Sequence, residues 1–253
     1  MIDAVVIKWR NGFGNQLFQY SYGKILAKEK GYDLVHDGKG RICAVDLFEF
    51  GFLKPEDIKR KTPQHNCKYL INYSREQAVD LENPHVYSSY LDKIKTFFPT
   101  QEKTNNEDLV VHLRLGDNGP NIYTPFEWYK KAIEDNNIKF NKLFLVTDEP
   151  QSEDAIKFKT YYNANIVSKH TIKTDSDRAP AAAETVKDFN FIRQFDKILF
   201  SNSTFAWWAA VLSNASEVYF NNEWQPNHHH GQIKLGETNY KNFKGICPFS
   251  LKD

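Results

Sequence analysis

Four short polar segments carry the residue types that bind anionic groups, and each of them follows an apolar run. They are RNGFGNQ (residues 10–16), RLGDN (residues 114–118), TDEP (residues 147–150) and SNST (residues 201–204). In open parallel sheets, ligands bind beyond the carboxyl ends of the strands. We therefore expect a functional site where such segments meet.

Two of these segments suit a phosphorylated ligand. Arg114 ends an apolar run, and its guanidinium can meet a phosphate as a bidentate pair while it stays fully charged. The alternative is a structural ion pair with Asp117. SNSTF (residues 201–205) adds hydroxyls and the first amides of a helix, which form an anion site, although N-capping by Ser203 or Thr204 explains the same residues. Together, the arginine and the helix N-terminus favour a diphosphate.

The glycine-containing segment near the amino terminus resembles a dinucleotide fingerprint. Gly12 and Gly14 fill two of the three GxGxxG positions, and Asp37 ends the next strand, about where a ribose-binding acid stands. Leu17 occupies the third position, where a side chain hinders close helix packing. A nicotinamide or flavin dehydrogenase is therefore kept only as an alternative.

Three other patterns favour structural roles. Asp175–Asp177 match the DxD pattern that holds a divalent cation and a sugar diphosphate, but the polar surroundings, TIKTDSDRAP, predict a solvated loop. The adjacent histidines at residues 228–230 are predicted to form a polar loop. Trp207 and Trp208 are predicted to fill the core.

Strands alternate with helices along most of the chain, which predicts an α/β fold with a parallel sheet covered on both faces. Strands are expected at residues 3–9, 32–37, 108–114, 142–147, 164–168, 197–201 and 217–220, and helices after residue 12, at 125–136, near 181–195 and at 204–213.

A chain of 253 residues is long enough for one large or two small α/β domains. The pattern weakens from residue 38 to residue 106, and the polar stretch PTQEKTNNED (residues 99–108) marks a boundary. We therefore expect an N-terminal domain over residues 1–104 and a C-terminal domain over residues 105–253.

Composition excludes several classes of partner. The 33 basic residues nearly balance the 32 acidic residues, so no strong field for nucleic acid or an anionic membrane follows. Cys43, Cys67 and Cys247 lie in no metal-ligand or CxxC spacing, which predicts reduced thiols. No signal peptide and no window near the ~20 apolar residues of a membrane span is found. We expect a soluble, cytoplasmic protein without a transmembrane segment.

Three longer segments carry a family resemblance. NGFGNQLFQYSYGKILA (residues 11–27), VVHLRLGD (residues 110–117) and DFNFIRQFDKILFSNSTFAWWAA (residues 188–210) resemble, in this order, the signatures of the α-1,2-fucosyltransferases of glycosyltransferase family 11. The last two are also similar to those of α-1,6- and protein O-fucosyltransferases. The resemblance implies a GT-B-like fold of two Rossmann-like halves with parallel sheets. It also implies that the C-terminal half binds GDP-fucose without a metal or cofactor, while the N-terminal half faces the acceptor.

The resemblance assigns roles to individual residues. Arg114 matches the arginine associated with the donor β-phosphate, His112 the histidine near the nucleotide, and Asp188 an acid that contacts the guanine base. The complete set of predicted donor-binding residues is Gly12, Gly14, Asn15, Gln16, His112, Asp148, Asp188, Ser201, Asn202, Ser203 and Thr204.

The implied reaction is an inverting transfer of L-fucose to a glycan hydroxyl, in α-1,2 linkage. Arg114, with the turn at residues 203–204, would stabilise the leaving diphosphate, and a base would help the attacking hydroxyl. Asp117 is predicted as this catalytic group because it closes the motif of Arg114, with a structural role as its alternative. By loop position, the other candidates are Glu127, Asp148 and Glu149.

Leu115 departs from the family pattern, because most members have a second arginine there. The donor sugar is therefore left open. A related inverting transferase that uses another nucleotide sugar, such as a UDP-pentose, is one alternative. A cation-dependent transferase that uses the DSD segment is another, and so is a module that binds nucleotide or carbohydrate without catalysis. The acceptor glycan and the oligomeric state do not follow from the sequence.

Overall fold

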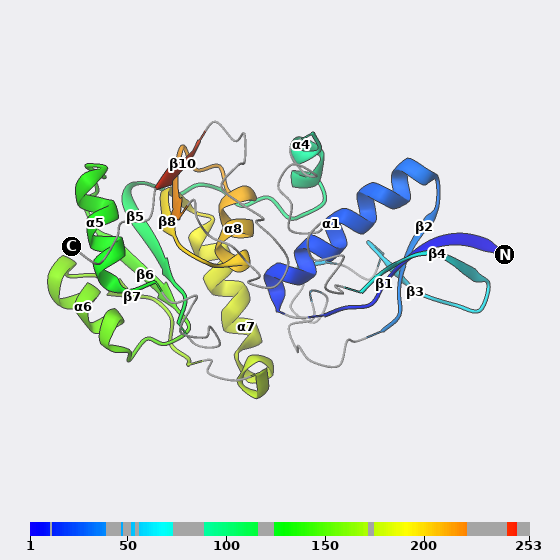
Figure 1. Ribbon diagram of the computed structural model, residues 1–253, viewed down its shortest axis with the longest axis horizontal. Coiled ribbons are helices and arrows are strands. Elements are labelled where there is room, and N and C mark those ends of the chain that lie inside the picture. The colour runs from blue at the N-terminus through cyan, green and yellow to red at the C-terminus, as the bar shows by residue number, and fades with distance from the viewer. Residues whose placement is uncertain are drawn as a thin grey trace.

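The chain forms two parallel sheets, one after the other along the sequence (Figure 1). The computed structural model describes residues 1–10, 12–38, 47, 52–53, 56–72, 89–115, 124–171, 175–221 and 242–246, with the side chains of residues 175–182 and of Ile246 excepted. In the first sheet the order is β3-β2-β1-β4. Its strands are β1 (Ile2–Ile7), β2 (Asp33–His36), β3 (Lys59–Arg60) and β4 (His65–Ile71).

The second sheet has the order β10-β9-β8-β5-β6-β7, and all its pairings are parallel. Its strands are β5 (Asn105–Leu113), β6 (Leu143–Thr147), β7 (Asn165–Ile166), β8 (Phe195–Phe200), β9 (Glu217–Asn221) and β10 (Phe243–Ile246). The central strand β5 is buried from Leu109 to Leu113, because helices cover both faces of the sheet.

Two helix layers cover this sheet. The helices α5 (Phe126–Asp135) and α6 (Glu153–Tyr162) lie on its outer face, where Leu109, Val111 and Leu113 pack against them (Figure 1). The helices α7 (Asp175–Ile192) and α8 (Thr204–Val211) lie on the face toward the first sheet. Since strand side chains alternate between faces, the buried run of β5 supplies both layers.

One helix joins the two halves. In Figure 1, α1 (Phe13–Lys30) begins beside α8 and runs back toward the first sheet. Its Phe18 ring stacks on Trp207 with the centroids 5.1 Å apart and meets Trp208 edge-on at 5.0 Å. Both tryptophans are fully buried, as predicted. A single apolar cluster therefore contains residues from both halves of the chain.

A buried arginine ties the connection between the sheets to the C-terminal half. Arg193 donates hydrogen bonds to the carbonyl of Leu212 at 3.3 Å, to the side chain of Asn190 at 2.9 Å and to the carbonyl of Pro99 at 2.5 Å. Burial lowers the pKa of Arg193 to about 10, so the guanidinium is charged at neutral pH. Pro99 lies between α4 (Leu91–Lys95) and β5, so this contact anchors the connection.

Most of the predicted elements are confirmed, and one interpretation is wrong. Asp175–Asp177 were expected in a solvated loop, but they open α7. The physical reason is that acidic residues are favourable in the first turn of a helix. Two further strands, β3 and β4, lie where the pattern predicted no element. From Cys67 to Leu70 β4 is exposed, so it has no buried apolar face that the sequence could reveal.

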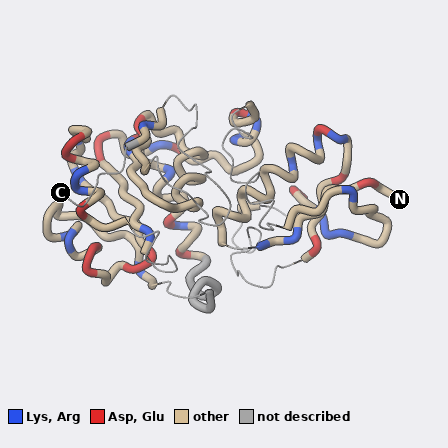
Figure 2. Tube along the Cα trace, in the orientation of Figure 1, with Lys and Arg blue, Asp and Glu red and all other residues tan. Residues whose placement is uncertain are grey.

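The predicted boundary between residues 104 and 105 stays a prediction, although the strands of the first sheet end at Ile71 and those of the second begin at Asn105. Within the described residues, no helix is long and apolar enough to cross a membrane. Basic and acidic residues are interspersed over the described parts of both halves (Figure 2).

Candidate functional site

The first turns of α1 and α8 touch each other. A β-carbon added to Gly14 would lie 2.6 Å from the backbone nitrogen of Phe205 and 2.6 Å from the carbonyl carbon of Thr204. Only glycine permits this approach. Thr204 also donates a hydrogen bond of 2.7 Å from Oγ1 to Oδ1 of Asn15. Because helix N-termini carry partial positive charge, their meeting favours an anion nearby.

Gly12 and Gln16, the other predicted residues of the first loop, are engaged in backbone contacts or buried. Gly12 precedes α1 in an extended conformation, and its carbonyl accepts from the amide of Gln16 at 3.0 Å. The side chain of Gln16 is buried. In this loop the structure shows that Gly14 and Asn15 join the halves, a role that the sequence did not predict. Donor contacts of these four residues, Gly12 and Gln16 included, stay predictions.

Arg114 has a carboxylate partner at the end of the neighbouring strand. Its Nη1 lies 2.7 Å from Oδ2 of Asp148, while the amide of Leu115 donates to Oδ1 of Asp148 at 2.9 Å. Asp148 is 7% exposed, and each of its oxygens has a partner, Oδ1 the amide of Leu115 and Oδ2 the guanidinium of Arg114. This arrangement suits a residue that orients Arg114 better than a general base. Asp117, the partner considered from sequence, lies outside the described residues.

His112 is buried and neutral beside this pair. Burial and the nearby Arg114 charge lower the pKa of His112 to about 3. Its ring lies 5.4 Å from the ring of Phe205, in the first turn of α8. Among the described residues, Nδ1 of His112 has no hydrogen-bond partner. Since buried polar atoms are normally paired, this nitrogen is suited to a ligand.

The side chain of Tyr129 on α5 supports the loop before α8. Tyr129 donates to the carbonyl of His112 at 3.1 Å, and its hydroxyl lies 2.6 Å from Oγ of Ser201. Ser201 is therefore part of the support, and Asn202 follows it half-buried. Tyr129 was not predicted as a site residue, because its position on a buried helix face gives the signal of a core residue.

The first turn of α8 presents amides rather than hydroxyls. Ser203 caps the helix by accepting from the amide of Ala206 at 3.3 Å, so the capping role considered from sequence is confirmed. Thr204 is bonded across to α1. Within the described chain, the amides of Thr204 and Phe205 make no hydrogen bond. They are the donors that an anion would meet.

Asp188 lies on α7, close to the same turn. The next residue, Phe189, packs its ring 5.3 Å from that of Phe205. Oδ2 of Asp188 accepts from Oγ of Ser168 at 2.8 Å, and Ser168 accepts from the amide of Thr147 at 3.0 Å. Burial raises the pKa of Asp188. Ser168 was not predicted, because a lone serine after a two-residue strand has no sequence signal.

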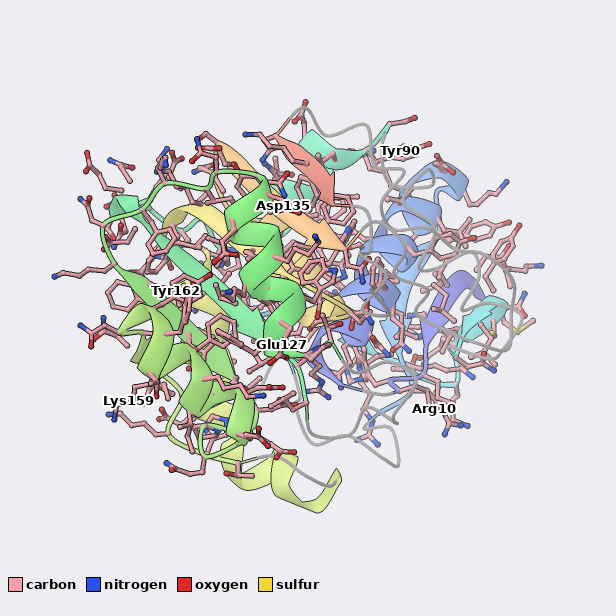
Figure 3. All side chains as sticks on the ribbon, turned by 60° about the vertical axis from the view of Figure 1, so that its left-hand side comes forward. Arg10, Tyr90, Glu127, Asp135, Lys159 and Tyr162 are labelled. Carbon is pink, nitrogen blue, oxygen red and sulfur yellow. The ribbon has the colours of Figure 1, made fainter. Side chains whose placement is uncertain are left out.

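Two of the other base candidates are exposed or half-exposed. Glu127 lies at the first turn of α5 (Figure 3) and pairs with Lys157 at 3.3 Å. Glu149 is half-buried, and its amide donates to Oγ1 of Thr147 at 3.2 Å. In the part of the chain that the structure describes, no three His, Cys, Asp or Glu residues are grouped to hold a metal ion.

Comparison with known proteins identifies a family likeness. The model of glycosyl transferase family 11 matches residues 151–246. This range contains α6 to β10, and with them Asp188 and the first turn of α8. The predicted resemblance to this family is confirmed over these residues, which include the third of the three motif segments. None of the curated proteins matches the chain.

Solved structures share the fold. The NodZ α-1,6-fucosyltransferase soaked with GDP-fucose is 15% identical, with a TM-score of 0.51, over 85% of this chain and 94% of that chain. The fucosyltransferase NodZ from Bradyrhizobium is 13% identical, with a TM-score of 0.51, over 86% and 95%. A mutant of Arabidopsis thaliana FUT1 in complex with GDP is 10% identical, with a TM-score of 0.51, over 90% and 71%. The predicted GT-B-like class, two Rossmann-like halves with parallel sheets, is confirmed.

Proposed function

We propose that the protein is an inverting fucosyltransferase that moves L-fucose from GDP-fucose to a hydroxyl of a glycan acceptor, in α-1,2 linkage. The observation that carries this proposal is the meeting of three groups beyond the second sheet. They are the Arg114–Asp148 pair, the buried His112 and the amides of Thr204 and Phe205, which make no hydrogen bond among the described residues. The family match over residues 151–246 supports it.

The chemistry follows from these charges. As the bond between the anomeric carbon and the diphosphate breaks, negative charge grows on the leaving group. Arg114 and the amides of Thr204 and Phe205 would stabilise that charge without rearranging, because protein contacts already hold them. The acceptor oxygen attacks from the opposite side, which inverts the configuration. These groups supply the positive charge that a metal ion supplies in other transferases, so the proposal includes metal independence.

The general base in this proposal is Asp117. It is chosen because it follows Arg114 by three residues and closes the same motif. Glu127 is the alternative among the described residues, because it stands at the first turn of α5, after the loop that follows β5. Asp148 is the weaker candidate, since both its oxygens are engaged.

The proposal also assigns the two halves. Residues 105–253 would bind the nucleotide sugar, and residues 1–104 would face the acceptor. Gly12, Asn15 and Gln16 at the start of α1 would close the donor site from the acceptor side, and the contact of Gly14 with α8 supports this. A cytoplasmic location belongs to the proposal and rests on the scattered cysteines.

Calorimetric titration tests the donor. GDP, GDP-fucose, GDP-mannose, UDP, UDP-xylose and NAD are each titrated with and without chelator. We expect GDP and GDP-fucose to bind selectively and equally well with chelator present. Preference for UDP-xylose would reassign the donor, and binding of NAD alone would favour the dehydrogenase alternative. A binding protein that turns over no acceptor in a broad glycan panel would be a module without catalysis.

A further inference from the structure

Two successive hydrogen bonds through Ser168 connect the carboxylate of Asp188 to the end of β6. The amide of Thr147, the last residue of β6, donates to Oγ of Ser168 at 3.0 Å, and the Ser168 hydroxyl donates to Oδ2 of Asp188 at 2.8 Å. Ser168 is 5% exposed and Asp188 is 8% exposed. A hydroxyl is the group that can accept and donate at once, so one oxygen fixes the carboxylate to the strand end.

The other oxygen of this carboxylate is left for a ligand. Among the described residues, Oδ1 of Asp188 makes no hydrogen bond, and it is not sealed from solvent as the unpartnered buried atoms are. An ionised carboxylate only accepts hydrogen bonds. Among the nucleobases, guanine presents two donors side by side, the N1–H and the 2-amino group. Adenine and uracil lack that pair, so a carboxylate held in one orientation selects guanine.

We propose that Ser168 is the positioning residue that makes the nucleotide site selective for guanosine diphosphate, by locking the carboxylate of Asp188 in the orientation that accepts both guanine donors. This inference rests on the proposed function, since it assumes that Asp188 meets the base of the donor. Ser168 itself touches no substrate.

The same end of β6 also positions the residue that would bind the diphosphate of the nucleotide. Thr147 holds Ser168, while the following residue, Asp148, holds Arg114 through an ion pair of 2.7 Å. Adjacent backbone positions thus fix the carboxylate for the base and the guanidinium for the diphosphate. Both contacts therefore depend on two adjacent residues at the end of β6.

Charged neighbours of Asp188 determine how the hydrogen bond from Ser168 acts on its ionisation. Burial and Glu184, one turn earlier on α7, raise the pKa of Asp188, whereas the hydroxyl of Ser168 and His170 lower it. Removing the hydroxyl leaves the buried carboxylate with one stabilising hydrogen bond fewer. Its pKa then rises further, and GDP binding, which needs the ionised form, should weaken at a higher pH than in the wild type.

The test compares GDP with inosine diphosphate, which lacks the 2-amino group, by calorimetry on the full chain. The variants are Ser168→Ala, Ser168→Thr, which keeps the hydroxyl, and Ser152→Ala. The last is a matched control, because Ser152 caps α6 by accepting from the amide of Ala155 and lies outside the site. Thermal melting confirms that each variant is folded.

In the wild type we expect GDP to bind about 10-fold or more tightly than inosine diphosphate, the effect of one hydrogen bond to a charged group. Ser168→Ala should bring this ratio close to one, and the pH at which GDP affinity falls should rise. Ser168→Thr and Ser152→Ala should keep the wild-type ratio. If Ser168→Thr does not fold, the comparison of the pH profiles of Ser168→Ala and Ser152→Ala still tests whether the Ser168 hydroxyl stabilises the ionised carboxylate.

Two results would overturn the inference in distinguishable ways. If the wild type binds GDP and Ser168→Ala keeps both the ratio and the pH profile, Ser168 has no role in base selection, and the proposed function stands. If the wild type does not bind GDP, the proposed function fails and the inference fails with it.

Discussion

At the scale of single residues, neighbouring side chains on one strand end have opposite electrostatic roles. The guanidinium of Arg114 lies 2.7 Å from the carboxylate of Asp148. His112, two residues earlier and buried, is held neutral by burial and by that same guanidinium. The site therefore combines a fixed positive charge with a neutral imidazole, which suits contact with a diphosphate ester.

Replacing Arg114 should damage turnover. Arg114→Ala removes the charge that would stabilise the leaving diphosphate, so we expect kcat/KM for GDP-fucose to fall on the order of 10²–10³-fold. Arg114→Lys should lose less, because it keeps the charge without the planar fork. Arg60→Ala, on the exposed strand β3, is the control. Steady-state kinetics that show near-normal turnover of Arg114→Ala would contradict the assignment.

His112 should make the fold sensitive to acid. Its pKa in the native state, about 3, is lower than the ordinary value of 6.5, so the unfolded chain binds a proton first. Stability is complete above pH 6.5 and is lost as the pH falls below it. At pH 5.5 the loss attributable to this residue is on the order of 1 kcal/mol relative to pH 7.5. Urea unfolding at both pH values should show a smaller pH effect for His112→Gln. An equal effect in both proteins would refute the burial argument.

At the scale of elements, two glycines of α1 face different neighbours. Gly14 faces the backbone of α8, which cannot yield, with contacts of 2.6 Å for an added β-carbon. Gly23 faces the terminal methyl groups of Ile7, Leu34 and Ile71, each at 3.1 Å from an added β-carbon. Side-chain methyl groups can move by a few tenths of an ångström, whereas a helix backbone moves only with the whole helix.

This difference predicts the outcome of two identical substitutions. Gly14→Ala should push α1 from α8 and lower the free energy of unfolding by about 1–3 kcal/mol. Gly23→Ala should change it by less than about 1 kcal/mol, because the gain in helix propensity offsets the tighter packing. Urea denaturation measures both. Equal effects would mean that the contact between α1 and α8 is not closely packed in solution.

At the scale of the whole molecule, the two sheets share one apolar cluster. Phe18 of α1 packs against Trp207 and Trp208 of α8, and the buried Arg193 bonds to the carbonyl of Pro99 in the connection. A domain with its own separate core could unfold alone. Here, separating the halves would expose both tryptophans.

We therefore predict that the full chain unfolds in a single transition. Urea curves from tryptophan fluorescence and from far-ultraviolet circular dichroism should coincide, since both sheets depend on the shared cluster. A fragment of residues 105–253, cut at the predicted boundary, should be less stable than the same residues within the full chain. Two separate transitions, or a fragment as stable as the full chain, would show independent domains.

Local pattern was sufficient for much of the fold. Alternating apolar strands and helices predicted a parallel sheet, the family resemblance implied two Rossmann-like halves, and the apolar run around Trp207 and Trp208 predicted a buried helix. Where a segment buries little, as in β4 from Cys67 to Leu70, the pattern carried no signal. Its place at the edge of the first sheet is a consequence of pairing with β1, which no local pattern records.

The sequence by itself determined which segments carry chemistry, because the side-chain types of residues such as Arg114, His112 and Asp188 follow directly from it. Only the tertiary structure decided which of them meet. It paired Arg114 with Asp148, placed Gly14 against α8 and set Ser168 behind Asp188. The physical reason is that parallel strand pairing and helix packing bring together residues far apart in the chain. Contacts between such residues do not follow from any local sequence pattern.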